Sequence, residues 1–246
     1  MTDIYRFADV DIRISSVHEK VHRLCEDYRT DGGTYDFAVE TTPEDIEYER
    51  ERSARTDELE GIPVRSFSNG YLEELAVYRK MAEILPDYGT LLMHGSAVAV
   101  DGAAYLFIAK SGTGKSTHTR LWRKLLLEKA VMINDDKPLV RVTEGGAVIY
   151  GTPWDGKHRL STNTACPLAA VCILERAKDN HIRQIDRSEA LPMLLQQTYR
   201  PEGIPALTRM LELTEKLAAS VRLYRLGCNM DISAAKLSYE AMRKGE

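Results

Sequence analysis

Residues 105–124 read YLFIAKSGTGKSTHTRLWRK, and they contain the order of elements that a phosphate-binding loop requires. The β-prone run 105–109 predicts a strand, the segment 110–117 (KSGTGKST) predicts a Gly-rich turn, and the apolar spacing that follows predicts a helix. Gly112 and Gly114 let the backbone curl so that successive N–H groups face phosphate oxygens, and the helix N-terminus adds the positive end of its dipole. We therefore expect a nucleotide-phosphate site here.

Two side chains of this loop have the chemistry that polyphosphate binding needs. Lys115 is expected to reach the β- and γ-phosphates, and the Ser116 hydroxyl is expected to ligate Mg²⁺. The usual motif opens with Gly, whereas this chain has Ala109, which ends the strand where a negative φ is allowed. An ordinary Gly-containing turn is the alternative, and the flanking strand and helix weigh against it. The expected nucleotide-binding residues are Ala109, Lys110, Ser111, Gly112, Thr113, Gly114, Lys115, Ser116 and Thr117.

A pair of carboxylates follows the next apolar strand. Residues 131–136 read VMINDD and end in Asp135 and Asp136. A strand-end aspartate downstream of a phosphate loop commonly holds the catalytic metal, directly or through water. One carboxylate can ligate Mg²⁺ while the other accepts a proton from an attacking hydroxyl, and the residues alone leave the order open. An Asp-Asp turn before Pro138 is the alternative.

Composition is typical of a globular protein inside the cell. The 246 residues are 43% apolar, enough for one large domain or a main domain with a smaller one. No apolar run approaches the roughly eighteen residues of a membrane span, and the N-terminus lacks the pattern of a signal peptide. We expect a cytoplasmic protein without a membrane partner. The four cysteines are scattered without a CxxC pair, which argues against a zinc site or a disulfide frame.

Charge is distributed unevenly along the chain. Residues 1–90 carry 21 Asp and Glu against 11 Lys and Arg, whereas the remainder carries 16 against 22. An acidic N-terminal third argues against nucleic acid as its partner. A mildly basic remainder suits a body that handles polyphosphate.

Residues 1–88 are expected to form a small α+β portion. The predicted elements are a strand at 5–14, a helix capped by Ser15 and Ser16, a strand at 35–39 and a helix at 71–85 that Pro86 ends. The charge-dense segment 44–60 fits a solvated helix or a mobile segment, and its pattern does not decide between them.

Residues 89–246 are expected to form an α/β body. Strands at 91–100 and 103–109 are joined through Asp101-Gly102, the strongest short-range hairpin signal. Further strands are predicted at 138–142, 147–152, 169–174 and 221–228, and helices at 188–220 (broken at 201–205) and 232–243. The pattern contains more hairpins than a purely doubly wound sheet.

A family resemblance rests on residues 91–117, LLMHGSAVAVDGAAYLFIAKSGTGKST, followed by VMINDD. This arrangement resembles the superfamily of HPr kinase/phosphorylase and phosphoenolpyruvate carboxykinase, whose members share a His-containing strand, a hairpin, an SGxGK[ST] loop and a strand ending in Asp-Asp. The resemblance implies a P-loop core of mixed sheet and helices of that type over residues 89–246. Carboxykinases are much longer, so the chain is closest to compact HPr-kinase-related serine kinases. Residues 1–88 match nothing in that superfamily, and we expect them to serve acceptor recognition or assembly.

Carried over to this sequence, the resemblance assigns roles to the residues singled out above. Lys115 becomes the phosphate clamp, Ser116 the metal-binding hydroxyl, Asp135 the catalytic carboxylate and Asp136 its metal-binding partner. His94 takes the place of a histidine near the transferred phosphate or a second metal.

One part of the HPr kinase pattern is missing. Those kinases place a Glu-Ile-Arg-Gly stretch by the metal, and this chain has TPWDGKHR at 152–159 instead. Asp155 is the candidate replacement for the missing Glu. Lys157, His158 and Arg159 are candidates for holding an anionic acceptor or transition-state charge, with a solvated basic loop as the equal alternative.

These observations predict a phosphotransferase that uses ATP or GTP with Mg²⁺ or Mn²⁺ and transfers the γ-phosphoryl group to a hydroxyl, foremost a serine of a peptide or protein. A kinase of a small-molecule alcohol and a non-catalytic nucleotide-binding regulator are the alternatives. Retention of Lys115, Ser116 and both aspartates weighs against the regulator, and chain length disfavours a carboxykinase-like decarboxylase. The expected partners are the nucleotide and the acceptor, with a homo-oligomer left open.

Overall fold

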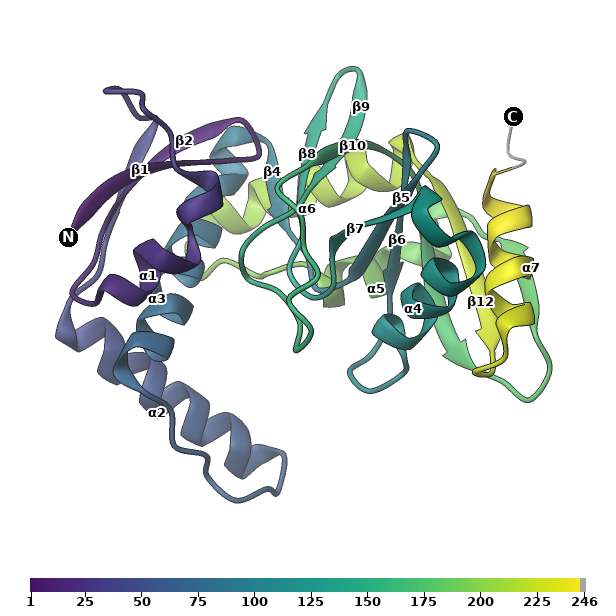
Figure 1. The fold of residues 1–246 in the computed structure, drawn as a ribbon, viewed down its shortest axis with the longest axis horizontal. Coiled ribbons are helices and arrows are strands. Elements are labelled where there is room, and N and C mark those ends of the chain that lie inside the picture. Colours follow the sequence, from purple (N-terminus) through teal and green to yellow (C-terminus); the bar gives the residue numbers. More distant parts are fainter. Residues whose placement is uncertain (244–246) are drawn as a thin grey trace. The chain divides into compact units, whose positions relative to one another are not determined.

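The computed structural model describes residues 1–243, and the chain divides into two compact units, Met1–Ile84 and a larger one that begins at Leu85 (Figure 1). Each unit has its own sheet.

The first unit contains a three-stranded sheet and two long helices. Its elements are β1 (Thr2–Phe7), β2 (Val10–Ser15), α1 (Glu19–Leu24), the 3₁₀ turn η1 (Glu26–Tyr28), β3 (Phe37–Glu40), α2 (Pro43–Leu59) and α3 (Asn69–Ile84). β1 and β2 pair antiparallel, and β3 joins β2 in parallel. The single strand expected at 5–14 is wrong, because the chain turns at Ala8 and Asp9, whose φ values are 52° and 58°. This is the two-residue turn that suits a tight hairpin, made here without the glycine that usually signals it.

The start of α1 also differs from the sequence prediction. The helix begins at Glu19 after His18, not at a serine cap. The buried carboxylate of Glu73 on α3 accepts the N–H groups of Val17 and His18 at 2.7 and 2.8 Å. Glu73 therefore satisfies the donors that a serine cap was expected to satisfy, and only the tertiary structure brings it there.

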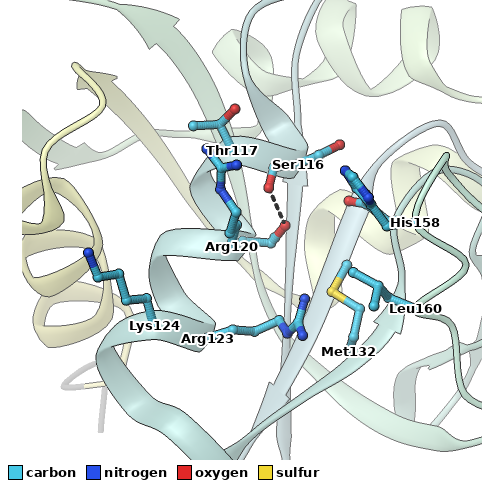
Figure 2. Close-up of a pocket in the computed structure, with 10 residues that line it drawn as sticks. Ser116, Thr117, Arg120, Arg123, Lys124, Met132, His158 and Leu160 are labelled. Carbon is cyan, nitrogen blue, oxygen red and sulfur yellow. Dashed lines mark hydrogen bonds between the residues drawn. The ribbon is translucent and has the colours of Figure 1, made fainter.

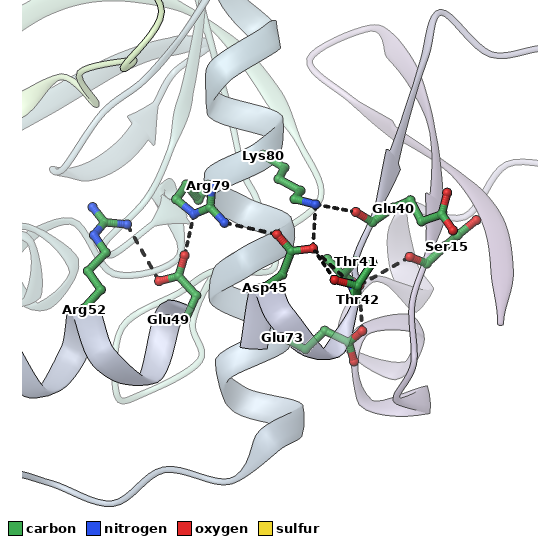
Figure 3. A network of polar contacts seen from close by, with 10 residues as sticks. All are labelled: Ser15, Glu40, Thr41, Thr42, Asp45, Glu49, Arg52, Glu73, Arg79 and Lys80. Carbon is green, nitrogen blue, oxygen red and sulfur yellow. Dashed lines mark hydrogen bonds and ion pairs between the residues drawn. The ribbon is translucent and has the colours of Figure 1, made fainter. Parts of the chain in front are cut away.

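The charge-dense segment 44–60 is helical, as α2. Asp45 accepts the N–H of Thr42 at the helix start, and it also pairs with Lys80 of α3 at 2.6 Å (Figure 3). One helical turn later, Arg79 reaches the buried Glu49 at 2.5 Å. Carboxylates on the inner face of α2 thus have cationic partners on α3, which offsets the cost of burying them.

The second unit is built on a nine-stranded mixed sheet. Its strands are β4 (Thr90–Leu92), β5 (Ser96–Val100), β6 (Ala103–Ile108), β7 (Ala130–Asn134), β8 (Leu139–Thr143), β9 (Gly146–Tyr150), β10 (Ala165–Arg176), β11 (His181–Gln184) and β12 (Arg222–Cys228). The order is β4-β8-β9-β10-β6-β5-β7, and β12 pairs with β10 and β11. β10 is parallel to β6 and β12 and antiparallel to β9. The expected α/β class with a mixed, hairpin-rich sheet is confirmed.

Helices cover both faces of this sheet. They are α4 (Lys115–Leu126), α5 (Arg187–Gln197), α6 (Ile204–Ser220) and α7 (Ile232–Arg243), with 3₁₀ turns η2 (Leu85–Tyr88) and η3 (Leu127–Lys129). Along β6, Tyr105 and Phe107 join a core with residues of α4 and α7, whereas Leu106 and Ile108 join a core with α5 and α6. The period of two in a strand produces this division and places α4 directly on β6.

Three strand predictions in this unit need correction. The run 91–100 is not one strand: β4 ends at Leu92, the chain crosses at Met93–Gly95, and β5 begins at Ser96 beside different neighbours. Gly95 permits the crossing, because a Cβ there would lie 2.6 Å from the side chain of Leu106. β10 is longer than the expected 169–174, and β11 was not predicted, because its His-Ile-Arg-Gln sequence is polar and short.

Burial of His118 on α4 predicts a pH-dependent stability. Burial lowers its pKa from 6.5 to about 4, and its Nε2 lies 3.0 Å from the Ser238 hydroxyl of α7. The unfolded chain binds a proton on His118 more tightly than the folded chain does. The stability that the neutral, buried ring contributes is therefore fully present above about pH 6.5 and is lost as the pH falls toward 4. His118→Gln is expected to flatten the fall in unfolding free energy across this window by on the order of a few kcal/mol. Urea titrations at several pH values measure the unfolding free energy. An equal dependence of that free energy on pH in the wild type and the variant would contradict the prediction.

Candidate functional site

The sheet topology brings three chain segments to one edge. β5 lies between β6 and β7 and is antiparallel to both. The carboxyl ends of β6 and β7 and the start of β5 therefore share that edge. They carry the Gly-rich loop, the Asp-Asp pair and Ser96, respectively.

The Gly-rich loop follows β6 in a turn that requires glycine at two positions. Ala109 is fully buried at the strand end, and the N–H of Thr113 donates to the carbonyl of Lys110 at 3.2 Å. Gly112 and Gly114 have φ values of 74° and 120°, which side chains rarely adopt. Helix α4 starts at the next residue, so its unpaired N–H groups border the loop. This backbone suits an anionic ligand.

Lys115 lies folded over this loop. Its Nζ donates to the carbonyl of Ala109 at 3.2 Å, and the residue is largely buried. Burial lowers the pKa of Lys115, and the negative charge of Asp136 opposes that effect. Burial disfavours the charged form of the Lys115 ammonium group, and an anion bound to the loop would stabilise that charged form again.

Asp135 is the buried carboxylate of the site, at 8% exposure. Ser96 donates to its Oδ1 at 2.6 Å, and Ser96 accepts in turn from Thr119 of α4 at 2.8 Å. Burial raises the pKa of Asp135, while hydrogen bonds from Ser96 and Ser116 oppose the rise. A carboxylate with a raised pKa that touches the Ser116 hydroxyl is suited to accept a proton or to help hold a metal.

Asn134 shapes the Asp-Asp pair at the end of β7. Its Oδ1 accepts the N–H groups of Asp136 and Lys137 at 2.8 and 2.6 Å, which forms a tight side-chain turn. Its Nδ2 donates to the carbonyl of Thr152 at 3.0 Å. The chain therefore turns sharply, and the two aspartates face different surroundings.

Asp136 lies among basic groups. Lys137 Nζ approaches it at 2.8 Å, and His94 Nε2 lies 3.4 Å from its other oxygen. Burial, together with the charges of Lys137 and Lys115, lowers the pKa of His94 to about 4, against the effect of Asp136. His94 is therefore neutral at pH 7, and its contact with Asp136 is not an ion pair.

The loop after β9 brings in only some of its candidate residues. Asp155 accepts the N–H of Asp135 at 3.3 Å and that of Ser161 at 2.8 Å, so its carboxylate braces the loop beside the site. Gly156 packs on Asp135, since a Cβ there would lie 3.0 Å from its Oδ2. Lys157 and Arg159 are exposed away from these contacts, whereas His158 lines a cavity next to Ser116.

Two cavities flank the start of α4 and share Thr117. The first, of about 610 Å³, extends from Ser116 and Asp135 along α4 to Met132 of β7 and to the loop that carries His158 and Leu160 (Figure 2). The second, of about 500 Å³, lies on the other side of the loop, against the ends of β10 and β12; it is lined by Gly112–Gly114, Thr117, His118, Leu121, Arg176, Ala177, Cys228, Asn229 and Met230. The loop backbone therefore separates the two cavities.

Several residues of the site were not predicted from the sequence. Ser96 and Thr119 contact one another beside Asp135, Lys137 contacts Asp136, and Arg176 donates to the carbonyl of Gly112 at 2.6 Å. Thr119 lies one turn after Ser116 on the predicted helix, so its spacing was a usable signal. Ser96 and Arg176 come from other strands, and no local pattern marks them.

Comparison with known sequences gives the family. Residues 72–231 match the family described as SynChlorMet cassette protein ScmC, and the chain belongs to this family. No functionally curated protein matches the chain. Among solved structures, the HPr(Ser) kinase/phosphatase from Coxiella burnetii is similar at 8% identity and a TM-score of 0.35, over 62% of this chain and 97% of that one. That distant likeness carries no argument about activity.

The described residues, 1–243, include no helix that is both long and apolar enough to cross a bilayer.

Ser96→Ala tests how Asp135 is held. The variant leaves a buried carboxylate oxygen without its donor, so the unfolding free energy is expected to fall by about 1–3 kcal/mol in urea titrations at pH 7. Ser220→Ala is the matched control, because that hydroxyl donates only to the carbonyl of Leu217. Equal stability of the two variants would show that Asp135 does not depend on Ser96.

Proposed function

We propose that this protein transfers the γ-phosphoryl group of ATP or GTP, with Mg²⁺, to a hydroxyl group, foremost the serine of a peptide or protein. The observation that carries the proposal is the convergence of Lys115, Ser116 and Asp135 around the glycine loop at the start of α4. Phosphoryl transfer needs a cradle for the phosphates, cations to neutralise them and a group to deprotonate the acceptor. These three residues and the loop backbone supply groups of each kind.

We infer the orientation of the bound nucleotide from the two cavities. With the phosphates on the loop backbone, the second cavity is the space for the base and ribose, since Leu121 and Met230 offer apolar surface and Asn229 and Arg176 offer polar groups. The γ-phosphate would then lie toward the first cavity, whose lining includes Ser116 and Asp135 and which leaves space for a second substrate.

The donor atoms proposed for the metal are oxygens, which Mg²⁺ prefers. Within residues 1–243, no three His, Cys, Asp or Glu side chains form a metal cluster of their own. Mg²⁺ suits such a site, because it is usually held by one or two carboxylates together with waters and substrate phosphates. Ser116 and Asp136 would hold the ion, which supplies positive charge to the transferring group.

The acceptor hydroxyl is assigned to Asp135. Its carboxylate lines the first cavity, and burial raises its pKa toward the range useful for a general base. The hydroxyl oxygen attacks the γ-phosphorus, a new O–P bond forms, and the bond from the γ-phosphorus to its bridging oxygen breaks. The proton goes to Asp135 and the nucleoside diphosphate leaves. His94, neutral beside Asp136, is placed as a hydrogen-bonding group rather than a charge.

Lys115→Ala tests the nucleotide site. The variant should fold normally, because the hydrogen bond that it removes, from Lys115 to the Ala109 carbonyl, lies between the loop and the strand end that leads into it. It removes a charge-assisted phosphate contact of about 1.5–3 kcal/mol, so ATP affinity measured by calorimetry with Mg²⁺ is expected to fall at least about tenfold. Lys129→Ala removes an exposed lysine from η3 and is the matched control. Equal affinity of wild type and Lys115→Ala would exclude the nucleotide site.

Asn substitutions separate the two aspartates. Asp135→Asn keeps the shape but removes the base, so kcat is expected to fall by roughly 10²–10⁴ with little change in nucleotide affinity. Asp136→Asn is expected instead to raise the Mg²⁺ concentration that gives half-maximal activity. Radiolabelled ATP with a serine-peptide library measures both, and Asp101→Asn in the β5–β6 turn is the control.

Three further outcomes of these measurements on the wild type and the two aspartate variants have distinct meanings. A swapped pattern would exchange the two roles and leave the reaction class intact. Near-wild-type transfer by both variants would exclude phosphoryl transfer at the pair. Nucleotide binding without any transfer by the wild type would favour a regulator that binds nucleotide without catalysis.

A further inference from the structure

Several cationic side chains line the first cavity. Arg120, Arg123 and Lys124 of α4 line it, and His158 lies across from them on the loop after β9 (Figure 2). Asp135 is the only carboxylate among the lining residues, all of which belong to the described part of the chain. Arg120, Arg123 and Lys124 are spaced three and four residues apart on α4, and Figure 2 shows Arg123 directed toward Met132 while Lys124 extends in the opposite direction.

Within the described residues, these cations have no acidic partner. Within residues 1–243, no carboxylate pairs with Arg120, Arg123 or Lys124, whereas other arginines of the same unit are paired, such as Arg209 with Asp87 at 2.8 Å. Like charges at three- and four-residue spacing repel one another. An anion in the cavity would relieve that repulsion and make charge-assisted hydrogen bonds to the guanidinium groups.

The cavity also has the position that an acceptor needs. Figure 2 shows Arg123 extending from α4 toward Met132 and Leu160, while the Arg120 guanidinium lies beside Thr117. A ligand held between these arginines would reach both Ser116 and Asp135, because all belong to one continuous space of about 610 Å³.

Resting on the proposed phosphotransfer, we propose that the acceptor is an acidic peptide, with Asp or Glu beside the serine that is phosphorylated. Arg120 and Arg123 bind the flanking carboxylates and so determine specificity, while the serine hydroxyl faces Asp135. Arginine binds the carboxylates of a peptide and a free phosphate by the same kind of charged hydrogen bond. The test therefore compares an acidic peptide with inorganic phosphate.

The test measures binding of two labelled peptides, EESEE and QQSQQ, to the full chain by fluorescence anisotropy, with and without MgADP. EESEE is expected to bind at least about tenfold more tightly than QQSQQ. Arg120→Gln with Arg123→Gln should abolish that preference. Lys129→Gln, which removes a positive charge outside the cavity, should keep it.

Each other result has a definite meaning. Equal binding of the two peptides by the wild type, or the same loss in Lys129→Gln, would overturn the proposal. So would a matching loss of ATP affinity in the double arginine variant, because the arginines would then serve the nucleotide. Inorganic phosphate binding more tightly than EESEE would identify a phosphate compound instead of a peptide. Failure of the wild type to bind ATP would refute the phosphotransfer alone, since the peptides are also measured without nucleotide.

Discussion

A carboxylate buried at a strand end is stable only when donors surround it, and the candidate site is organised around meeting that requirement for Asp135. Ser96 comes from β5, Ser116 from α4 and the brace of Asp155 from the loop after β9. Ser96 and Ser116 donate to the Asp135 carboxylate from different elements, whereas Asp155 accepts the backbone N–H of Asp135. One residue therefore ties the glycine loop, the sheet edge and the second loop together. A carboxylate held this way keeps its position while its pKa stays raised.

The same requirement explains why the two aspartates are not equivalent. Asn134 turns the chain after β7, so Asp135 points into the buried network while Asp136 lies near Lys137 and His94. Neighbouring residues of identical chemistry thus have opposite surroundings, one dominated by burial and hydroxyl groups and the other by basic groups. Division of labour between adjacent carboxylates becomes possible once the backbone turn separates them.

The two units differ in how their charged side chains are paired. In the first, Glu49 and Asp45 meet Arg79 and Lys80 across the α2–α3 pair, which closes a structural network. In the second, Arg120, Arg123 and Lys124 of α4 line a cavity and have no carboxylate partner among residues 1–243. Satisfied pairs hold helices together, whereas unsatisfied charge on a concave surface is what a ligand recognises.

The sequence by itself determined the α/β class, the hairpin at Asp101-Gly102 and the strand, glycine turn and helix around Lys115, because these depend on local periodicity and on backbone conformations that only glycine adopts. It did not determine the break at Gly95, the hairpin at Ala8-Asp9 or the capping of α1 by Glu73. Nor did it mark Ser96 as the donor to Asp135. The Ala8-Asp9 hairpin lacks the glycine that usually signals such a turn, and each of the others depends on a neighbour farther away in the chain. Such contacts leave no periodic trace, so only the tertiary structure decided which residues complete the site.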